Sequence, residues 1–222
     1  MDETTQFGIG LSPGDRHYRA YVGPPERYDL VAAMQFNLLT HCGMREYHTL
    51  LDIGCGSLRL GRLAIPYLRP GNYYGLEPHA WLIDEAIEKE CGRDLVRIKQ
   101  PQFRTDADFG LRRFGVKFDF LLAQSIFSHA AAAQIDCCLG EAAACMHAKS
   151  KFLATYFPGE TDYEGQQWLY PACCTYTEAT MIRFAETRNL VCTRLDWHHP
   201  HGQRWILLET AEPRTVTHPR HA

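Results

Sequence analysis

The sequence predicts a single α/β domain with a mostly parallel sheet and helices on both of its faces. Short apolar segments alternate with segments of helical periodicity along most of the chain, which is typical of βαβ units. A glycine turn stands where the first apolar segment passes into the helical segment after it. The 222 residues, 45% of them hydrophobic, suffice for one such domain and its core. We place the domain at residues 27–210, between an N-terminal arm (1–26) and a C-terminal tail (211–222).

The arm is expected to be irregular and to lead into a first helix. Its residues are rich in glycine, proline and aromatic side chains, and they show no helical or strand periodicity. A helix is expected over residues 26–42, because Leu30, Met34 and Leu38 recur every four residues and mark an amphipathic face.

The first half of the domain is expected to contain two strand–helix units and a third strand. Strands are predicted over residues 49–53 and 73–76, and helices over residues 58–68 and 80–91. Proline and glycine end the first of these helices, and Gly92 ends the second. The third strand lies either at residues 96–99 or in the few residues around Phe103.

The second half of the domain adds four strands, which brings the predicted sheet to seven. They lie over residues 118–123, 151–156, 191–196 and 204–209. An alanine-rich helix is predicted over residues 130–147, behind the first of these strands, and another helix over residues 178–187.

The composition argues against several classes of partner. The formal net charge of −3 is too small to indicate nucleic acid or a membrane surface, so neither is an expected partner. No stretch reaches the roughly 20 apolar residues of a membrane helix, and the N-terminus lacks the apolar run of a signal peptide. We therefore expect a cytoplasmic protein. The sequence does not indicate its oligomeric state.

The nine cysteines favour a reducing compartment and not a disulfide framework. Two adjacent pairs, 137–138 and 173–174, have a spacing that rarely suits a disulfide, and no C-x-x-C pair is present to bind zinc. Most of these cysteines are expected to be small buried apolar residues.

The segment Leu51-Asp52-Ile53-Gly54-Cys55-Gly56 carries the functional prediction. Glycines at a strand-to-helix turn let a ligand approach the main chain, and the following helix points its amide groups at that ligand. A dinucleotide site needs a third glycine three residues after the second, where this chain has Arg59. The carboxylate of Asp52 would repel a pyrophosphate but favours a cation. The turn therefore predicts S-adenosylmethionine, a sulfonium cofactor, and not NAD.

This segment resembles motif I of the class I S-adenosylmethionine-dependent methyltransferases. Residues 118–124 (Phe-Asp-Phe-Leu-Leu-Ala-Gln) resemble motif IV of the same family, in which the strand end at Gln124 holds the methionine portion of the cofactor. The resemblance covers roughly residues 45–210, and the whole chain is similar to a bacterial small-molecule branch of the family. It implies a Rossmann-like fold, S-adenosylmethionine as the cofactor and methyltransferase activity.

The resemblance also implies residues that bind the adenosine portion of the cofactor. Glu77, at the end of the second strand, corresponds to the acidic residue that accepts both ribose hydroxyls, since one carboxylate presents two oxygens to a vicinal diol. Pro78 would lie against one face of the adenine. Asp106 and Ala107 match the acidic position that accepts from the adenine amine, with Asp108 as the alternative carboxylate.

His129 and Arg59 are candidates for the reacting end of the site. His129 follows the fourth strand and is the candidate general base. In the alternative interpretation, Ser128 caps the next helix and His129 only occupies its first turn. Arg59 is expected in the first turn of its helix, where the dipole disfavours a cation. Its partner is the methionine carboxylate, the carboxylate of the acceptor, or Glu46 or Glu85 on the surface.

Two further segments are candidates for contact with the acceptor. Asp196 and His199 lie in a histidine-rich loop that we assign to the acceptor, because adjacent histidines cannot converge on one metal ion without a distant ligand. Tyr18 and Tyr21 offer aromatic faces in the arm, which either covers the cofactor as a lid or packs on the outside of the sheet. Tyr21 is assigned to the cofactor site, and no metal site is assigned.

The predicted function is methyl transfer from S-adenosylmethionine to a small molecule. An RNA or protein acceptor is the alternative, against which the chain lacks a basic extension. A further alternative is a protein that binds the cofactor without catalysis. The sequence does not name the acceptor or the atom that is methylated.

Overall fold

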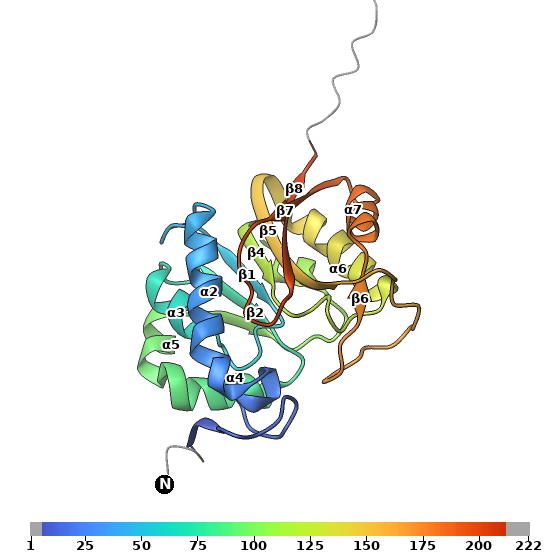
Figure 1. Cartoon of the computed structure of the whole chain (residues 1–222). Helices are drawn as coiled ribbons and strands as arrows, with labels where there is room; N and C mark the ends of the chain where they lie inside the picture. The colour runs from blue at the N-terminus through green and yellow to red at the C-terminus, as the bar shows by residue number, and fades with distance from the viewer. Residues whose placement is uncertain (1–5, 212–222) are drawn as a thin grey trace, which may run out of the picture.

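The computed structural model describes residues 6–211, which form an eight-stranded sheet with helices on both faces (Figure 1). Seven strands follow the order β3-β2-β1-β4-β5-β8-β7, and β6 pairs with β5 off this path. The strands are β1 (Leu50–Ile53), β2 (Tyr73–Leu76), β3 (Gln102–Arg104), β4 (Phe118–Ala123), β5 (Met146–Pro158), β6 (Thr175–Tyr176), β7 (Leu190–Leu195) and β8 (Arg204–Thr210). Only the pairs of β8 with β5 and β7 are antiparallel. The predicted Rossmann-like fold is confirmed, with eight strands in place of seven.

The central strands β1, β2 and β4 are mostly apolar because helices cover both faces of the sheet. Successive side chains of a strand point to opposite faces. In β4, Leu121 and Ala123 enter one core cluster, whereas Phe120 and Leu122 enter the other. Sandwiched strands of this kind are continuous hydrophobic runs and do not alternate with polar residues.

One face is covered by α2 (Tyr28–His41), α3 (Gly61–Tyr67) and α4 (Ala80–Ala86), and the opposite face by α6 (Ala132–Cys145) and α7 (Glu178–Glu186). Figure 1 shows the two groups on either side of the sheet. The helices place apolar side chains in the cluster on their own face, which explains the two separate cores.

The buried face of α2 differs from the predicted one. Met34 and Leu38 are buried as expected, but Leu30 is 53% exposed. A step of four residues exceeds the helical period of 3.6, so residues at i, i+4 and i+8 drift around the helix. Val31, seven residues before Leu38, takes the buried position that the pattern assigned to Leu30.

The first half of the chain resolves the open question of the third strand. Residues 93–99 form the helix α5 (Arg93–Lys99), which excludes residues 96–99 as the strand. The third strand is β3, around Phe103, paired parallel with β2. The helix predicted over residues 80–91 consists of two parts. The α-helix α4 continues as the π-helical segment η3 (Ile87–Cys91), which ends at Gly92.

In the second half, β5 is longer than predicted because its first residues pair separately. Met146 pairs with Phe118, and Lys151 then pairs with Phe120, so an irregularity of the ladder lies between the two pairs. β6 has only two residues and was not predicted. A short 3₁₀ helix, η4 (Leu111–Phe114), also precedes β4.

The N-terminal arm is attached to the domain by a buried ion pair. Arg19 and Glu90 are bonded to each other, and their side chains are 8% and 7% exposed. The hydroxyl of Tyr18 donates to Glu90 at 2.8 Å, and the ring is buried. Tyr18 therefore anchors the arm and offers no face to a ligand, which corrects that part of the prediction. Two 3₁₀ helices, η1 (Ala20–Val22) and η2 (Pro25–Arg27), then lead into α2.

The remaining expectations concern cysteines, membrane helices and the tail. The nine cysteines are free thiols, of which four are buried, three half-buried and two exposed. No helix within residues 6–211 combines the length and the apolar character needed to cross a membrane. The predicted tail lies outside the described residues except for Ala211.

Candidate functional site

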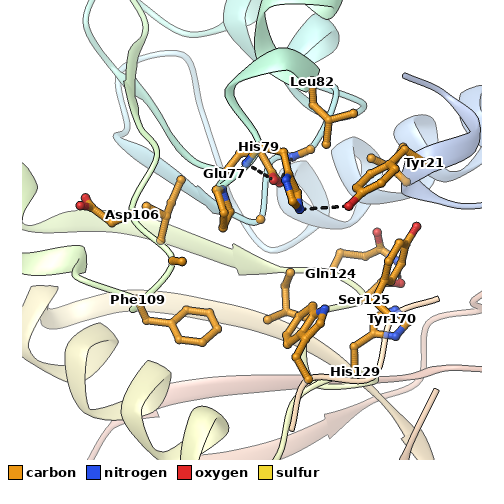
Figure 2. Close-up of a pocket in the computed structure, with 18 of the residues that line it drawn as sticks. Tyr21, Glu77, His79, Leu82, Asp106, Phe109, Gln124, Ser125, His129 and Tyr170 are labelled. Atoms are coloured by element: carbon orange, nitrogen blue, oxygen red, sulfur yellow. Dashed lines mark hydrogen bonds between the residues drawn. The ribbon is translucent and has the colours of Figure 1, made fainter. Parts of the chain in front are cut away.

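A cavity of about 550 Å³ opens above the carboxyl ends of β1, β2, β3 and β4 (Figure 2). This is where ligands bind in open α/β sheets. Ten of the predicted site residues line it, namely Tyr21, Gly54, Gly56, Arg59, Glu77, Pro78, Asp106, Ala107, Gln124 and His129. Asp52, Asp196 and His199 do not. Residues that the sequence analysis missed include Val22, His79, Leu82, Phe109, Ser125, Ile126, Gln134, Trp168 and Tyr170.

The glycine turn after β1 requires its glycines. Gly54 and Gly56 have φ angles of +69° and +53°, in the left-handed region that favours glycine. A Cβ at Gly54 would overlap Cδ1 of Ile126, and one at Gly56 would lie 2.7 Å from Cγ1 of Val22. The turn therefore leaves its main chain open to the cavity and lets the arm pack directly on it.

Glu77 joins the ends of β1 and β2 through its carboxylate. Its Oε2 accepts from the backbone N–H of Gly56 at 3.1 Å, and its Oε1 accepts from that of His79 at 2.9 Å. Burial raises the pKa of this carboxyl, and the hydrogen bond from His79 opposes the shift. Each oxygen has a second acceptor site, because a carboxylate offers about four. The arrangement is an oriented acceptor pair in the wall of the cavity.

Asp52 lies behind the glycine turn and outside the main cavity. It contributes to a small space of about 30 Å³ that Gln35, Arg59 and Gln124 also line. A space of this size is sufficient to hold an ordered water molecule. Oδ2 of Asp52 accepts from the hydroxyl of Tyr73 at 2.7 Å. Burial raises the pKa of Asp52 to about 6, opposed by this hydrogen bond and by Arg59.

Arg59 is held by uncharged oxygens. Its guanidinium donates to the carbonyl of Val22 at 2.9 Å and to Oε1 of Gln124 at 2.5 Å. Its Nε is buried without a partner in the described part of the chain. Burial lowers the pKa of Arg59. A cation enclosed in this way favours an anionic ligand, because burying a charge without a partner is costly.

The expectation of a surface ion pair for Arg59 is wrong. Glu46 pairs with Arg69 at 3.4 Å, and Glu85 pairs with Lys89 at 2.6 Å. The position of Arg59 also differs from the prediction, because α3 begins only at Gly61. Arg59 therefore lies in the turn before the helix and not in its first turn.

Gln124 is the centre of a buried polar network. Its Oε1 accepts from Arg59 and from Nε2 of Gln35, the latter at 2.6 Å. Because a guanidinium only donates, this contact fixes the orientation of the amide. Its Nε2 then donates to Oγ of Ser125 at 2.6 Å and lies 3.1 Å from Nε2 of His199. Both ends of the side chain are thus occupied by protein groups.

The loop between β7 and β8 meets the site through His199 and through Gln203, whose Nε2 donates to Oγ of Ser125 at 2.6 Å. His199 is buried, and burial lowers its pKa to about 3, so the ring is neutral. Its Nε2 lies 3.1 Å from Nε2 of Gln124, and its Nδ1 accepts from the backbone N–H of His201 at 3.2 Å. Asp196 is exposed at the surface. The loop therefore supports Gln124 from behind and does not face the cavity, which corrects the predicted contact with the acceptor. Within residues 6–211 no three His, Cys, Asp or Glu side chains are grouped so that they could hold a metal ion.

Asp106 lines the rim of the cavity, but arginines occupy its carboxylate. Arg104 donates to it at 2.6 Å, and Arg113 lies at 3.0 Å. The hydrogen bond from Arg104 lowers the pKa of Asp106. In Figure 2 the carboxylate points away from the other labelled side chains. The alternative residue, Asp108, is paired with Arg113 at 2.6 Å and does not line the cavity.

His129 has a defined tautomer. Its Nδ1 lies 2.9 Å from the carbonyl oxygen of Leu169 and 2.8 Å from that of Ala172. Carbonyl oxygens only accept, so Nδ1 carries the hydrogen and Nε2 has a free lone pair. Burial lowers the pKa of His129, which keeps the ring neutral near pH 7. His129 therefore presents a proton acceptor in the wall of the cavity.

The helix-capping interpretation of Ser128 and His129 is wrong. The residue at the N-cap position of α6 is Ala131, whose backbone N–H donates to the side chain of Gln134 at 2.9 Å. Oγ of Ser128 is buried without a partner in the described chain. His129 lies three residues before the helix, in a turn that the segment from Leu169 to Cys174 clamps through backbone hydrogen bonds.

Aromatic side chains from distant segments complete the cavity. Trp168 and Tyr170 come from the long connection between β5 and β6, and Tyr21 comes from the arm. The hydroxyl of Tyr21 lies 3.0 Å from Nε2 of His79, and its ring centroid is 5.5 Å from that of Tyr170 (Figure 2). A long connection without regular structure was the available signal in the sequence, because such loops are often functional.

Residues 51–152 match the family described as "Methyltransferase domain". This range contains the glycine turn, Glu77 and the strand β4. This part of the chain is therefore similar to methyltransferase domains. No curated protein sequence matches the chain.

Solved structures with the same fold cover nearly the whole chain. Magnesium protoporphyrin IX methyltransferase from Synechocystis PCC 6803, with bound S-adenosylhomocysteine (SAH), is 13% identical, with a TM-score of 0.63 over 94% of this chain and 92% of that one. An S-adenosylmethionine-dependent methyltransferase from Clostridium acetobutylicum is 10% identical, with a TM-score of 0.58 over 90% and 94%. Mitomycin 7-O-methyltransferase is 17% identical, with a TM-score of 0.62 over 87% and 56%.

Proposed function

We propose that the chain is a class I S-adenosylmethionine-dependent methyltransferase that transfers the methyl group to a small-molecule acceptor. One observation carries this proposal. A single cavity contains the glycine turn, the buried carboxylate of Glu77 and the free Nε2 of His129. Its volume of about 550 Å³ falls in the range of small-ligand sites, about 300–1,000 Å³.

The residues present suit the cofactor. Glu77 keeps two acceptor positions for the ribose hydroxyls, and Gly54 and Gly56 line the cavity with main chain that bears no side chain. Arg59 has a buried donor without a protein partner, which suits the carboxylate of the methionine portion. Pro78 and Ala107 lie at the ends of β2 and β3, where the adenine would be held. We assign Asp106 only to the rim, because arginines hold its carboxylate.

When bound, S-adenosylmethionine supplies an electrophilic methyl group on a sulfonium. The chain must exclude water, align the acceptor and take up a proton when the acceptor is a hydroxyl or an amine. Val22 covers the glycine turn. Tyr21 from the arm and Tyr170 from the β5–β6 connection lie beside each other in the wall of the cavity. His129 is the general base, because Nδ1–H is held by two carbonyls and Nε2 is free to accept.

The network around Gln124 has a positioning role in this proposal. Gln124 fixes Arg59 on one side and Ser125 on the other, and His199 supports it from behind. Buried networks that are fully satisfied are rigid, and a small displacement in an active site lowers the rate strongly. Asp52 and the small space beside it have room for one water molecule between the carboxylate and the turn.

Two measurements test this function. Calorimetric titration with S-adenosylmethionine, SAH, NAD and NADP should show binding of the first two only. Formation of SAH should then be followed with pools of small hydroxylated and amino compounds, with total RNA and with unfolded protein as separate acceptors. Binding of NAD alone, or turnover confined to the RNA or protein samples, would contradict the proposal.

A further inference from the structure

The cavity has two chemically different ends. The end built by β2 and β3 carries both carboxylates that line the cavity, Glu77 and Asp106. The other end has no carboxylate among its lining residues. There Tyr170, His129 and Trp168, together with Tyr21, whose hydroxyl reaches toward the first end and lies 3.0 Å from Nε2 of His79, form a surface that we call the aromatic wall. The proposed cofactor uses the first end, so the aromatic wall is free to contact the acceptor.

The aromatic wall is continuous. The ring centroids of Tyr21 and Tyr170 are 5.5 Å apart, those of Tyr170 and His129 are 5.0 Å apart, and those of His129 and Trp168 are 5.7 Å apart. These separations lie in the range of aromatic pairs. Figure 2 shows Tyr21, Tyr170 and His129 gathered on one side of the cavity. Three segments of the chain, the arm, the turn after β4 and the β5–β6 connection, meet to build it.

We propose that the acceptor is a planar aromatic molecule with a hydroxyl group, whose ring packs on the aromatic wall beside His129. This inference rests on the proposed function and names its substrate class. Trp168 is 40% exposed although it lines the cavity, so a large apolar surface is left open at this end. A flat ring covers such a surface and gains the edge and face contacts that an aliphatic ring lacks.

The charges around the wall exclude a cationic acceptor. Aromatic side chains also attract cations, so an amine has to be considered. Arg59 lies in the same cavity, and the two lining carboxylates are already hydrogen-bonded at the opposite end. The residues of the aromatic wall include no carboxylate that could pair with a cation there. A neutral or anionic ring is compatible with this arrangement.

The hydroxyl group of the proposed acceptor molecule is inferred from His129, which is the proton acceptor in the aromatic wall. Nδ1–H of His129 is committed to Leu169 and Ala172, and Nε2 is left with a lone pair. In the transfer, the acceptor O–H proton moves to Nε2 while the oxygen forms its bond to the methyl carbon. The carbon–sulfur bond breaks with its electron pair remaining on sulfur, and the imidazolium then loses its proton to solvent. Atoms and charges balance without a further reactant.

The test uses matched probes on the full chain saturated with SAH. Calorimetry would compare 2-naphthol with decahydro-2-naphthol, which has the same skeleton without aromaticity, and with 2-naphthylmethylamine, which is a cation. We expect 2-naphthol to bind about 5-fold or more tightly than the saturated ring, the equivalent of two aromatic contacts. In Trp168→Leu this preference should fall by about 2- to 12-fold, the equivalent of one contact. Tyr47→Leu, an exposed aromatic outside the cavity, is the matched control.

Equal affinity for the two ring systems, stronger binding of the cation, or no binding of 2-naphthol would overturn the inference. So would an unchanged preference in Trp168→Leu. SAH titration of the unloaded chain separates this failure from that of the proposed function. Normal SAH binding without the aromatic preference rejects the acceptor class alone, whereas lost SAH binding rejects the methyltransferase assignment of the site.

Discussion

Replacing Glu77 by alanine tests the centre of the proposed cofactor site. Glu77 is 6% exposed, and its carboxylate accepts one backbone N–H at each oxygen, from Gly56 and from His79. The substitution removes the charge and both remaining acceptor positions. Because burial opposes the ionised form of Glu77, we expect the loss to weaken ligand binding more than it weakens the fold.

The magnitude follows from hydrogen bonds to a charged acceptor, which contribute about 1.5–3 kcal/mol each. Two ribose hydroxyls would share one partly desolvated carboxylate, so we put the combined loss at about 2–3 kcal/mol and not at twice the single value. This corresponds to an increase in the Kd for SAH of about 30- to 140-fold. Glu85→Ala, on the exposed side of α4, is the matched control and should bind normally.

Calorimetric titration with SAH and with its 2′,3′-dideoxy analogue is the decisive assay. The wild-type chain should lose affinity for the analogue, whereas Glu77→Ala should bind both ligands equally weakly. A Kd for SAH within threefold of the wild-type value would refute the reasoning. A variant that still discriminates between the two ligands would show that another residue accepts from the ribose.

Three further predictions concern the turn and the two histidines. Gly56→Ala should abolish SAH binding, because its Cβ would press on Val22, whereas Gly71→Ala, also at positive φ but in open space, should bind SAH like the wild type in the same titration. His129→Ala should lower kcat by about 100-fold at an unchanged Kd for SAH. The wild-type rate should rise with pH through the lowered pKa of His129 and level off, and a flat wild-type profile would exclude the base. The pKa of His199 is about 3 in the folded chain and about 6.5 when unfolded, so the unfolded chain binds more protons between these values. Urea unfolding should therefore show stability falling as pH drops from 6.5 toward 3, less steeply in His199→Gln, and equal slopes would contradict this assignment.

The confirmed predictions concern features that depend on residues close together in the sequence. The strands β2 and β4 have their predicted bounds because short apolar runs between glycine or charged residues leave little choice of conformation. The glycine turn follows from a strand, a turn and a helix within about fifteen residues. The first residue of a helix is less well predicted, as the position of Arg59 shows. A turn that precedes a helix can contain the same apolar residues as the first turn of the helix.

The parts of the site that sequence analysis missed depend on contacts between distant segments. Trp168 and Tyr170 show no periodicity, and nothing near them in the sequence indicates that their loop packs on His129, some 40 residues earlier. The expected contact of Asp196 and His199 with the acceptor was wrong for the same reason. The direction of a loop is decided by the elements it packs against.

The sequence by itself determined the chemistry available at this site, namely the glycine turn, the acidic residue after the second strand and the histidine after the fourth. These are local patterns, set by backbone conformation and residue type. Only the tertiary structure decided what those residues can do. The carbonyls of the β5–β6 connection select the tautomer of His129, and Gln124 holds Arg59 with the support of His199, 75 residues away. Protonation and orientation depend on the groups that surround a side chain, and folding brings those groups together from across the chain.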